Sequence, residues 1–213
     1  MLAKTYGSAV YGVNAFIITI EVDIGQGTQF FMVGLPDSAV KESQQRVEAA
    51  IKFFNYQMPR QKVVVNLAPA DIKKEGSFYD LPIALAILSA SNQVDLPTLD
   101  QYLVMGELSL DGQLRPLRGI LPIAIEARKQ GFKGFILPKE NAREAAIVDQ
   151  LEIIGVTNIK EAVEHLNGKN IIAPMQYDTR ENFEFYQNEY EVDFSDVQGQ
   201  ENIKRAFEIA AAG

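Results

Sequence analysis

The sequence predicts an α/β protein in which helices pack on a mixed β-sheet, an α+β arrangement of two layers. Two observations support this prediction. Short runs of β-branched and aromatic residues alternate with segments whose apolar residues recur at helical spacing. The composition, 47% hydrophobic and 23% charged over 213 residues, is typical of a globular protein with one generous domain or one domain plus an appendage.

The N-terminal part is predicted to form a β-hairpin followed by a helix. Residues 13–24 (VNAFIITIEVDI) and 30–35 (FFMVGL) are two apolar runs on either side of a glycine-rich turn. Asp37 or Ser38 can cap the helix that follows, and Pro59 lies beyond its end. One face of this helix collects Val40, Val47, Ala50, Ile51 and Phe54.

Residues 62–90 predict a buried strand and then a buried helix. KVVVNLAP (62–69) is a short continuous apolar run, which is typical of a strand covered on both faces. A charged turn at 73–76 leads to Asp80, which we expect to be the N-cap, with Pro82 in the first helical turn. The apolar face of this helix is formed by Leu81, Leu85 and Leu88.

The second half of the chain continues the alternation of strands and helices. Asp111-Gly112 supplies a turn between a strand at 102–109 and a return strand that ends near Pro116. The remaining elements are expected as strands at 134–138 and 151–156 and as helices at 119–130, 139–148 and 158–167.

The C-terminal part differs from the rest in composition. Residues 168–192 are polar, acidic and aromatic without a clear period, which predicts a linker. Residues 178–213 carry a net charge of −6, so the first 177 residues are nearly neutral. The last segment, 193–213, is helical in pattern, with an apolar stripe of Ile203, Phe207 and Ala210. A single amphipathic helix cannot bury its own stripe, so it must dock on the body, on another copy or on a further domain.

Composition also excludes several classes of site. The absence of cysteine excludes a disulfide scaffold, a thiol nucleophile and cysteine-ligated zinc. His165 is the sole histidine, so no metal site is expected, and its predicted place near a helix C-terminus suits an imidazolium cation. Met1 is not followed by a signal peptide, and no apolar run is long enough to span a bilayer. We therefore expect a cytoplasmic protein without membrane contact.

The loop before the buried helix is the first candidate for a functional site. A phosphate loop needs several glycines and a lysine followed by Ser or Thr, whereas Glu75-Gly76-Ser77 offers one glycine and no such lysine. Gly25-Gln26-Gly27 lies in a predicted hairpin turn rather than before a helix. Ser77 lies near a helix N-terminus and fits a nucleophile if a base, either His165 or a lysine, reaches it.

Longer blocks of the sequence carry a family resemblance. VGLPDSAVKESQQRVEAAI, VNLAPADIKKEGSFYDLPIAL and GELSLDGQLRPLRGILPIAIEARKQGFKGFILPKENAREA resemble, in this order, the N-terminal domain of the Mg-chelatase-like AAA+ proteins of the YifB/ComM group. The final DFSDVQGQENIKRAFEIAAAG is similar to the segment that opens their ATPase module. The resemblance implies a ChlI-type, Lon-like domain at 1–168, a linker at 169–192 and the start of an ATPase domain at 193–213, which ends before the Walker A loop.

That N-terminal domain resembles in turn the proteolytic domain of Lon and the C-terminal domain of RadA. The implied fold is that of the Lon protease C-terminal domain, which is also the fold of the second domain of ribosomal protein S5. Lon-type enzymes use a Ser-Lys dyad, and the matching positions here hold Phe78 and Leu121. A shifted loop would put Ser77 in the place of the nucleophile, but leucine cannot serve as its base.

Two roles remain for the loop that has lost the dyad. The first is purely structural, because the glycine, the cap and the buried helix are explained by the fold. The second role is DNA contact. The implied topology brings two loops together, and the basic side chains on them could contact phosphates: Lys73, Lys74, Arg115 and Arg118. We expect Lys73 and Lys74 to face water, because burying an ammonium without a carboxylate partner costs several kcal/mol.

The resemblance also carries expectations for a longer protein. It implies a homohexameric ring that hydrolyses ATP with Mg²⁺ and acts in branch migration of DNA, with this chain binding the ATPase module of the same polypeptide. The segment that contains Val197, Gln198 and Gly199 would border the adenine pocket, and no cofactor is expected within the chain itself. The two functional hypotheses are therefore an accessory interaction domain of a DNA-remodelling ATPase and a residual Lon-like Ser-Lys peptidase.

The 213-residue chain is expected not to bind Mg-ATP tightly, because it lacks the Gly-Lys-Ser/Thr loop that wraps the phosphates. Titration calorimetry with Mg-ATP should show no saturable heat in the micromolar range. A micromolar dissociation constant would contradict the expectation.

Overall fold

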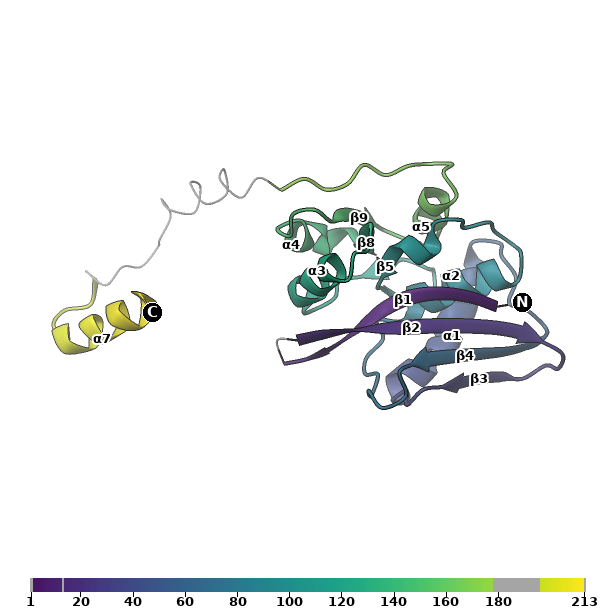
Figure 1. The fold of residues 1–213 in the computed structure, drawn as a ribbon, viewed down its shortest axis with the longest axis horizontal. Helices are drawn as coiled ribbons and strands as arrows, with labels where there is room; N and C mark the ends of the chain where they lie inside the picture. Colours follow the sequence, from purple (N-terminus) through teal and green to yellow (C-terminus); the bar gives the residue numbers. More distant parts are fainter. Residues whose placement is uncertain (1, 13, 178–195, 213) are drawn as a thin grey trace. The chain divides into compact units, whose positions relative to one another are not determined.

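The computed structural model describes residues 2–12, 14–177 and 196–212 of the chain (Figure 1). Two compact units are distinguished, residues 1–177 and residues 178–213. The first unit holds a sheet and its helices. In the described part of the second unit, the chain forms the helix α7 (Glu201–Ala212).

The first unit is built on a seven-stranded sheet with the order β3-β4-β2-β1-β5-β8-β9 (Figure 1). Its strands are β1 (Leu2–Tyr11), β2 (Asn14–Gly25), β3 (Phe30–Val33), β4 (Lys62–Ala68), β5 (Tyr102–Val104), β8 (Gly134–Pro138) and β9 (Glu152–Val156). The β1–β2 and β2–β4 pairs are antiparallel, and the other neighbouring pairs of this sheet are parallel. A small antiparallel ladder joins β6 (Glu107–Leu108) to β7 (Leu114–Arg115). The predicted mixed sheet of an α/β protein is thus confirmed.

The helices of the first unit fall close to their predicted places. They are α1 (Ser38–Phe53), α2 (Asp80–Ala90), α3 (Ile120–Lys129), α4 (Ala142–Ala145) and α5 (Ile159–Leu166), with 3₁₀ turns at Leu99–Gln101 and Lys139–Asn141. Asp37 caps α1 as predicted, since its carboxylate accepts the Val40 N–H at 2.7 Å. The helix expected at 139–148 is shorter than predicted, because a 3₁₀ turn replaces its start.

Two hydrophobic cores lie on opposite faces of the sheet. Leu103 belongs to the core under α3 and α4, whereas its neighbour Val104 belongs to the core under α1, α2 and α5. Because successive side chains alternate across a strand, β5 separates the two cores, and β8 and β9 divide their residues in the same way. Three layers are therefore present over this half of the sheet, and the predicted two-layer arrangement is wrong there.

The edge of the sheet at β3 and β4 has two layers. In Figure 1, α1 and α2 lie behind the broad strands β1, β2 and β4. Val63, Val65 and Leu67 of β4 are buried against them, while the alternate residues of this strand stay partly exposed. The prediction of a strand buried on both faces is therefore wrong for β4, because a run of valines also suits a face that is only half covered.

The predicted hairpin between 13–24 and 30–35 is also wrong. The partner of β2 is β1, which was not predicted as a strand, and β4 lies between β2 and β3. The chain after β3 approaches β4 so closely that a Cβ on Gly34 would lie 2.0 Å from the Leu67 carbonyl oxygen. Gly34 has a φ of +96°, so both space and backbone conformation require glycine at this crossing.

The segment after α5 is held to the body of the first unit. The Met175 N–H donates to the Ile153 carbonyl of β9 at 2.8 Å, and Asn170 N–H donates to the Glu164 carbonyl at 3.1 Å. The compact unit consequently runs to Tyr177, beyond the boundary expected at 168. The rest of the predicted linker, residues 178–192, lies outside the described residues.

α7 lies within the predicted helical segment, and the side chains of its stripe residues Ile203 and Phe207 are more than half exposed. Residues 193–195 of that segment lie outside the described part of the chain. Among the helices that the structure describes, none has the length and apolarity needed to cross a membrane.

His165 does not act as a cation at a helix end, contrary to the sequence-based expectation. Its ring is buried against Tyr102, and its Nδ1 accepts the backbone N–H of Ile172 at 3.1 Å. Burial lowers the pKa of His165, Glu152 raises it and Lys133 lowers it, with a net lowering from 6.5. A neutral imidazole is therefore the form that holds the segment after α5.

We expect the fold to lose stability in acid partly through His165. Its pKa is lower in the folded chain than in the unfolded one, so its contribution is complete above about pH 6.5 and is lost as the pH falls through the folded pKa. Urea unfolding at neutral and mildly acidic pH should show a smaller acid loss for His165→Gln than for the parent chain. Equal losses would contradict this assignment.

Candidate functional site

The loop at 71–80 is fixed by backbone contacts with Gly106, which follows β5. Gly106 N–H donates to the Phe78 carbonyl, and its own carbonyl accepts the Leu81 N–H, both at 2.9 Å. A Cβ at Gly106 would lie 2.5 Å from a methyl carbon of Leu114 and 3.1 Å from the Cβ of Leu81. Glycine thus lets the end of β5 pack directly on the start of α2, and the predicted strand 102–109 breaks at this point into β5 and β6.

Asp80 is not the N-cap of α2, as the sequence had suggested, but the centre of a buried polar cluster. Tyr79 occupies the cap position without a side-chain cap bond. The carboxylate of Asp80 accepts Arg46 Nε at 2.6 Å, Arg46 Nη2 at 3.0 Å, Ser43 Oγ at 2.5 Å and Leu108 N–H at 3.1 Å. These contacts join α1, α2 and β6 at one fully buried group.

The charges of this cluster support one another. Burial raises the pKa of Asp80 above its usual range, although hydrogen bonds from Arg46, Ser43 and Leu108 oppose the rise. The hydrogen bond to Asp80 is in turn the main cause that raises the pKa of Arg46. Because every contact to the carboxylate comes from a donor, the geometry favours the ionised form. All its lone pairs are engaged, so the cluster holds elements together and leaves Asp80 no capacity for acid–base catalysis.

Lys74 is buried, and the prediction that it faces water is wrong. Its side chain is fully inaccessible, and its ammonium donates to the backbone carbonyls of Gly34, at 2.8 Å, and of Pro69. Backbone carbonyls replace the carboxylate that we expected a buried lysine to need. Burial lowers the pKa of Lys74, and Asp71 opposes this. The ammonium therefore ties the loop after β3 to the loop after β4.

Lys73 remains at the surface as expected. Its ammonium lies 2.7 Å from Glu75, and its backbone carbonyl accepts the Tyr11 hydroxyl at 2.8 Å. The hydrogen bond to Glu75 raises the pKa of Lys73. Neighbouring lysines thus have opposite environments, which the sequence alone could not distinguish.

Ser77 contacts an acid rather than a base. Its hydroxyl donates to the carboxylate of Glu107 on β6, and the other oxygen of that carboxylate lies 3.9 Å from Arg115 Nε. The structure therefore brings the loop at 71–80 and the β6–β7 ladder together, while a shared surface of Lys73, Arg115 and Arg118 stays a prediction. Among the described residues, no lysine ammonium is hydrogen-bonded to Ser77, so the arrangement for a Ser-Lys dyad is not present there.

Phe78 and Leu121, at the positions that match the Lon dyad, both lie against the core under α3 and α4. Each is partly buried. Leu121 lies in the first turn of α3, where its N–H donates to the Glu144 carboxylate at 3.3 Å. The two residues supply apolar contacts and no group that can transfer a proton.

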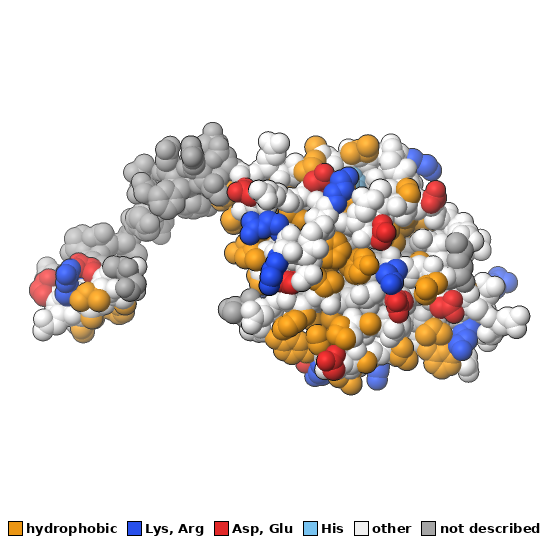
Figure 2. Space-filling model, in the orientation of Figure 1, with side chains coloured by type: hydrophobic (Ala, Val, Ile, Leu, Met, Phe, Trp, Pro, Cys, Tyr) orange, Lys and Arg blue, Asp and Glu red, His pale blue; other side chains and the backbone are white. Residues whose placement is uncertain are grey.

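The remaining candidate residues lie at the surface. Arg118 is exposed and forms no ion pair with any residue that the structure describes. Val197, Gln198 and Gly199 precede α7 in the second unit and are exposed as well. Figure 2 shows basic side chains interspersed with acidic and apolar ones over the visible face of the first unit.

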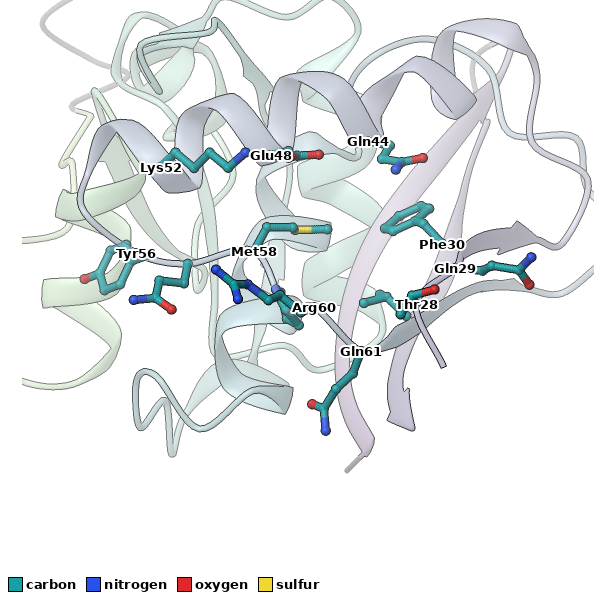
Figure 3. Close-up of a pocket in the computed structure, with 13 residues that line it drawn as sticks. Thr28, Gln29, Phe30, Gln44, Glu48, Lys52, Tyr56, Met58, Arg60 and Gln61 are labelled. Atoms are coloured by element: carbon teal, nitrogen blue, oxygen red, sulfur yellow. Dashed lines mark hydrogen bonds and ion pairs between the residues drawn. The ribbon is translucent and has the colours of Figure 1, made fainter. Parts of the chain in front are cut away.

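A polar groove was not found by sequence reasoning. It lies between α1, the start of β3 and the connection at 56–61, and its volume is about 490 Å³ (Figure 3). Gln44, Glu48 and Lys52 line it from α1, where their spacing of four residues puts them on one face. That spacing is visible in the sequence. Only the fold, however, places the opposite wall with Arg60 against it.

Comparison of the sequence with known proteins assigns the chain to a family. A family model for subunit ChlI of Mg-chelatase matches residues 20–141, more than half of the chain. The chain belongs to this family. The match includes α1, β4, the loop at 71–80 and the polar cluster around Asp80.

Curated relatives confirm the predicted YifB/ComM group. Competence protein ComM of Haemophilus influenzae is 39% identical over 213 residues, which are all of this chain and 42% of that protein. The uncharacterized protein YifB of Escherichia coli is 41% identical over 214 residues, with 100% of this chain and 41% of that protein covered. The DNA repair protein RadA of Streptococcus pneumoniae is 35% identical over 92 residues, or 43% of this chain and 21% of RadA. The chain thus spans about two fifths of the length of its ComM and YifB relatives.

Within the described residues, no group of three acidic or histidine side chains is placed to hold a metal ion. The word Mg-chelatase in the family's description is therefore not matched by a metal-binding cluster among the described residues. The buried side chains at the candidate site engage one another, which is the arrangement expected of a structural centre.

We predict that Asp80→Asn lowers the free energy of unfolding by about 3 kcal/mol, because it removes one charge of a buried pair and turns one acceptor into a donor. Urea denaturation of the 213-residue chain measures this loss. The matched control is Glu75→Gln, which removes an exposed carboxylate of the same loop and should change stability little. Similar effects of the two substitutions would contradict the central role of Asp80.

Proposed function

We propose that this chain is the non-catalytic N-terminal domain of a Mg-chelatase-like AAA+ ATPase that remodels DNA. The observation that supports this most strongly is the alignment of the whole chain with competence protein ComM. The partial alignments with DNA repair protein RadA from two bacteria point to the same kind of substrate. A DNA substrate also suits the cytoplasmic location expected from the sequence.

The proposal includes a Lon-like fold for the first unit. The alignment with RadA supports it, because the expected resemblance of this domain extends to both the C-terminal domain of RadA and the proteolytic domain of Lon. The non-catalytic role is supported by the chemistry of the loop. Ser77 donates to Glu107, and the nearest lysine in sequence, Lys74, is engaged by two backbone carbonyls. A residual Ser-Lys peptidase would need a free amine at Ser77, so this alternative is not supported by the contacts found.

ATP, Mg²⁺ and the hexameric ring belong to the proposal for a longer protein. The residues of this chain do not fit a nucleotide triphosphate site, because the sequence has no Gly-Lys-Ser/Thr loop. We propose that Val197, Gln198 and Gly199 border the adenine pocket of the adjoining ATPase module. The first unit would then act as an accessory domain that binds the ATPase module and contacts DNA.

Burial removes one residue from the set of four cations proposed to contact DNA. Lys74 is buried, so its ammonium cannot reach a phosphate. Lys73 and Arg115 are exposed but lie near Glu75 and Glu107, while Arg118 has no such partner among the described residues. Arg118 is consequently the strongest phosphate ligand of the set, with Arg115 and Lys73 next to acids that weaken their attraction.

In the full-length protein, replacing Lys73, Arg115 and Arg118 together with alanine should weaken DNA binding and flatten its salt dependence, because each phosphate contact adds counterion release. Fluorescence anisotropy over a salt series measures both quantities. Lys74 stays unchanged in this variant, since its loss would test the fold instead. Arg128→Ala, an exposed arginine at the end of α3, is the control for loss of charge. A parent protein that binds no DNA would overturn the proposed function.

A further inference from the structure

The polar groove along α1 has the size and shape of a ligand site. Its volume of about 490 Å³ lies within the range typical of small-molecule pockets. In Figure 3 the side chains of Lys52, Glu48 and Gln44 form a row along α1, and Met58 and Phe30 lie below this row. Arg60 lies across from α1, on the connection between α1 and β4.

Two polar groups in the groove have no partner within the described chain. The guanidinium of Arg60 is exposed and makes no ion pair there, and the half-buried carboxamide of Gln44 makes no hydrogen bond there. By contrast, the ammonium of Lys52 is 2.6 Å from the Glu48 carboxylate. The carboxamide of Gln93 beside the groove is also engaged. It accepts the Gln57 N–H and donates to the Gln57 carbonyl, both at 2.7 Å.

The apolar part of the groove is aromatic at both ends. Phe30 and Tyr56 line it and are each partly exposed, and Met58 lies between them in Figure 3. Burial raises the pKa of Tyr56, and the nearby Glu164 adds to this, so Tyr56 presents a neutral phenol. Rings of this kind stack on nucleobases with little dependence on sequence.

We propose that this groove binds single-stranded DNA, with a phosphate at Arg60 and a base against Tyr56 or Phe30 within reach of Gln44; the inference rests on the proposed function. A guanidinium pairs with phosphate through parallel hydrogen bonds, and a glutamine amide can read a base edge. A single strand can insert a base between α1 and the connection at 56–61, whereas a duplex keeps its bases stacked and would meet only the rim. An acidic peptide would also pair with Arg60, but it would leave the rings of Tyr56 and Phe30 unused.

Fluorescence anisotropy of the 213-residue chain with a labelled oligothymidylate tests the proposal. Arg60→Gln should weaken binding severalfold and reduce the slope of log K against log salt by about 0.7, the value for one phosphate contact on a single strand. Tyr56→Leu, which keeps an apolar side chain but removes the stacking ring, should weaken binding by about tenfold with an unchanged slope. Arg128→Gln is the matched control and should change neither quantity.

Unchanged thermal unfolding of each variant would show that the fold is intact. No binding of oligothymidylate, or equal losses for Arg60→Gln and Arg128→Gln, would overturn the groove as the site. So would loss of polyglutamate binding by Arg60→Gln with oligothymidylate binding intact, because that result identifies a peptide groove. These failures concern the groove alone. The proposed function fails only if the full-length protein itself does not bind DNA.

Discussion

The fold of the first unit depends on one buried carboxylate. Asp80 receives hydrogen bonds from α1, through Ser43 and Arg46, and from the backbone of β6, through Leu108. A carboxylate in the core is unfavourable unless donors surround it, so each of these elements has to be in place before the charge is satisfied. The cluster thus couples the helical layer to the small β6–β7 ladder, and it fixes the start of α2 at the point where the candidate loop ends.

A second buried charge fixes the other end of the same loop. Lys74 reaches the carbonyls of Gly34 and Pro69, and its backbone pairs with residues 35–37 ahead of α1. Asp37 belongs to the same region, because its carboxylate caps α1 and also accepts the Gly76 N–H at 3.2 Å. The loop is consequently held by side chains at both ends, and the groups that looked available for chemistry are used to hold it.

This arrangement shapes the functional interpretation. A loop with Glu75, Gly76 and Ser77 before a helix resembles the surroundings of a nucleophile, yet Ser77 is oriented by Glu107 and the dyad positions are apolar. Polar groups without a partner within the described residues lie elsewhere, and they include Arg60 and Gln44 in the groove between α1 and the connection at 56–61. Surfaces other than the loop at 71–80 can therefore serve for binding, because function resides in sites carried by a fold and not in the fold itself.

The sequence by itself determined most of the helices and the family, whereas it missed β1. The helical spacing of Val40, Val47 and Ile51 predicted α1, and Asp37 just before this run predicted its N-cap. Long sequence motifs identified the YifB/ComM group. Tertiary structure alone decided which strands pair. It also decided how β4 is covered, since the apolar run at 62–68 fits a strand buried on one face as well as a strand buried on both. It also decided the roles of Lys73 and Lys74, which are adjacent in sequence. The burial of a side chain and the position of its partners depend on segments far apart in the chain. The local pattern therefore could not show that Lys73 lies at the surface while Lys74 binds two backbone carbonyls.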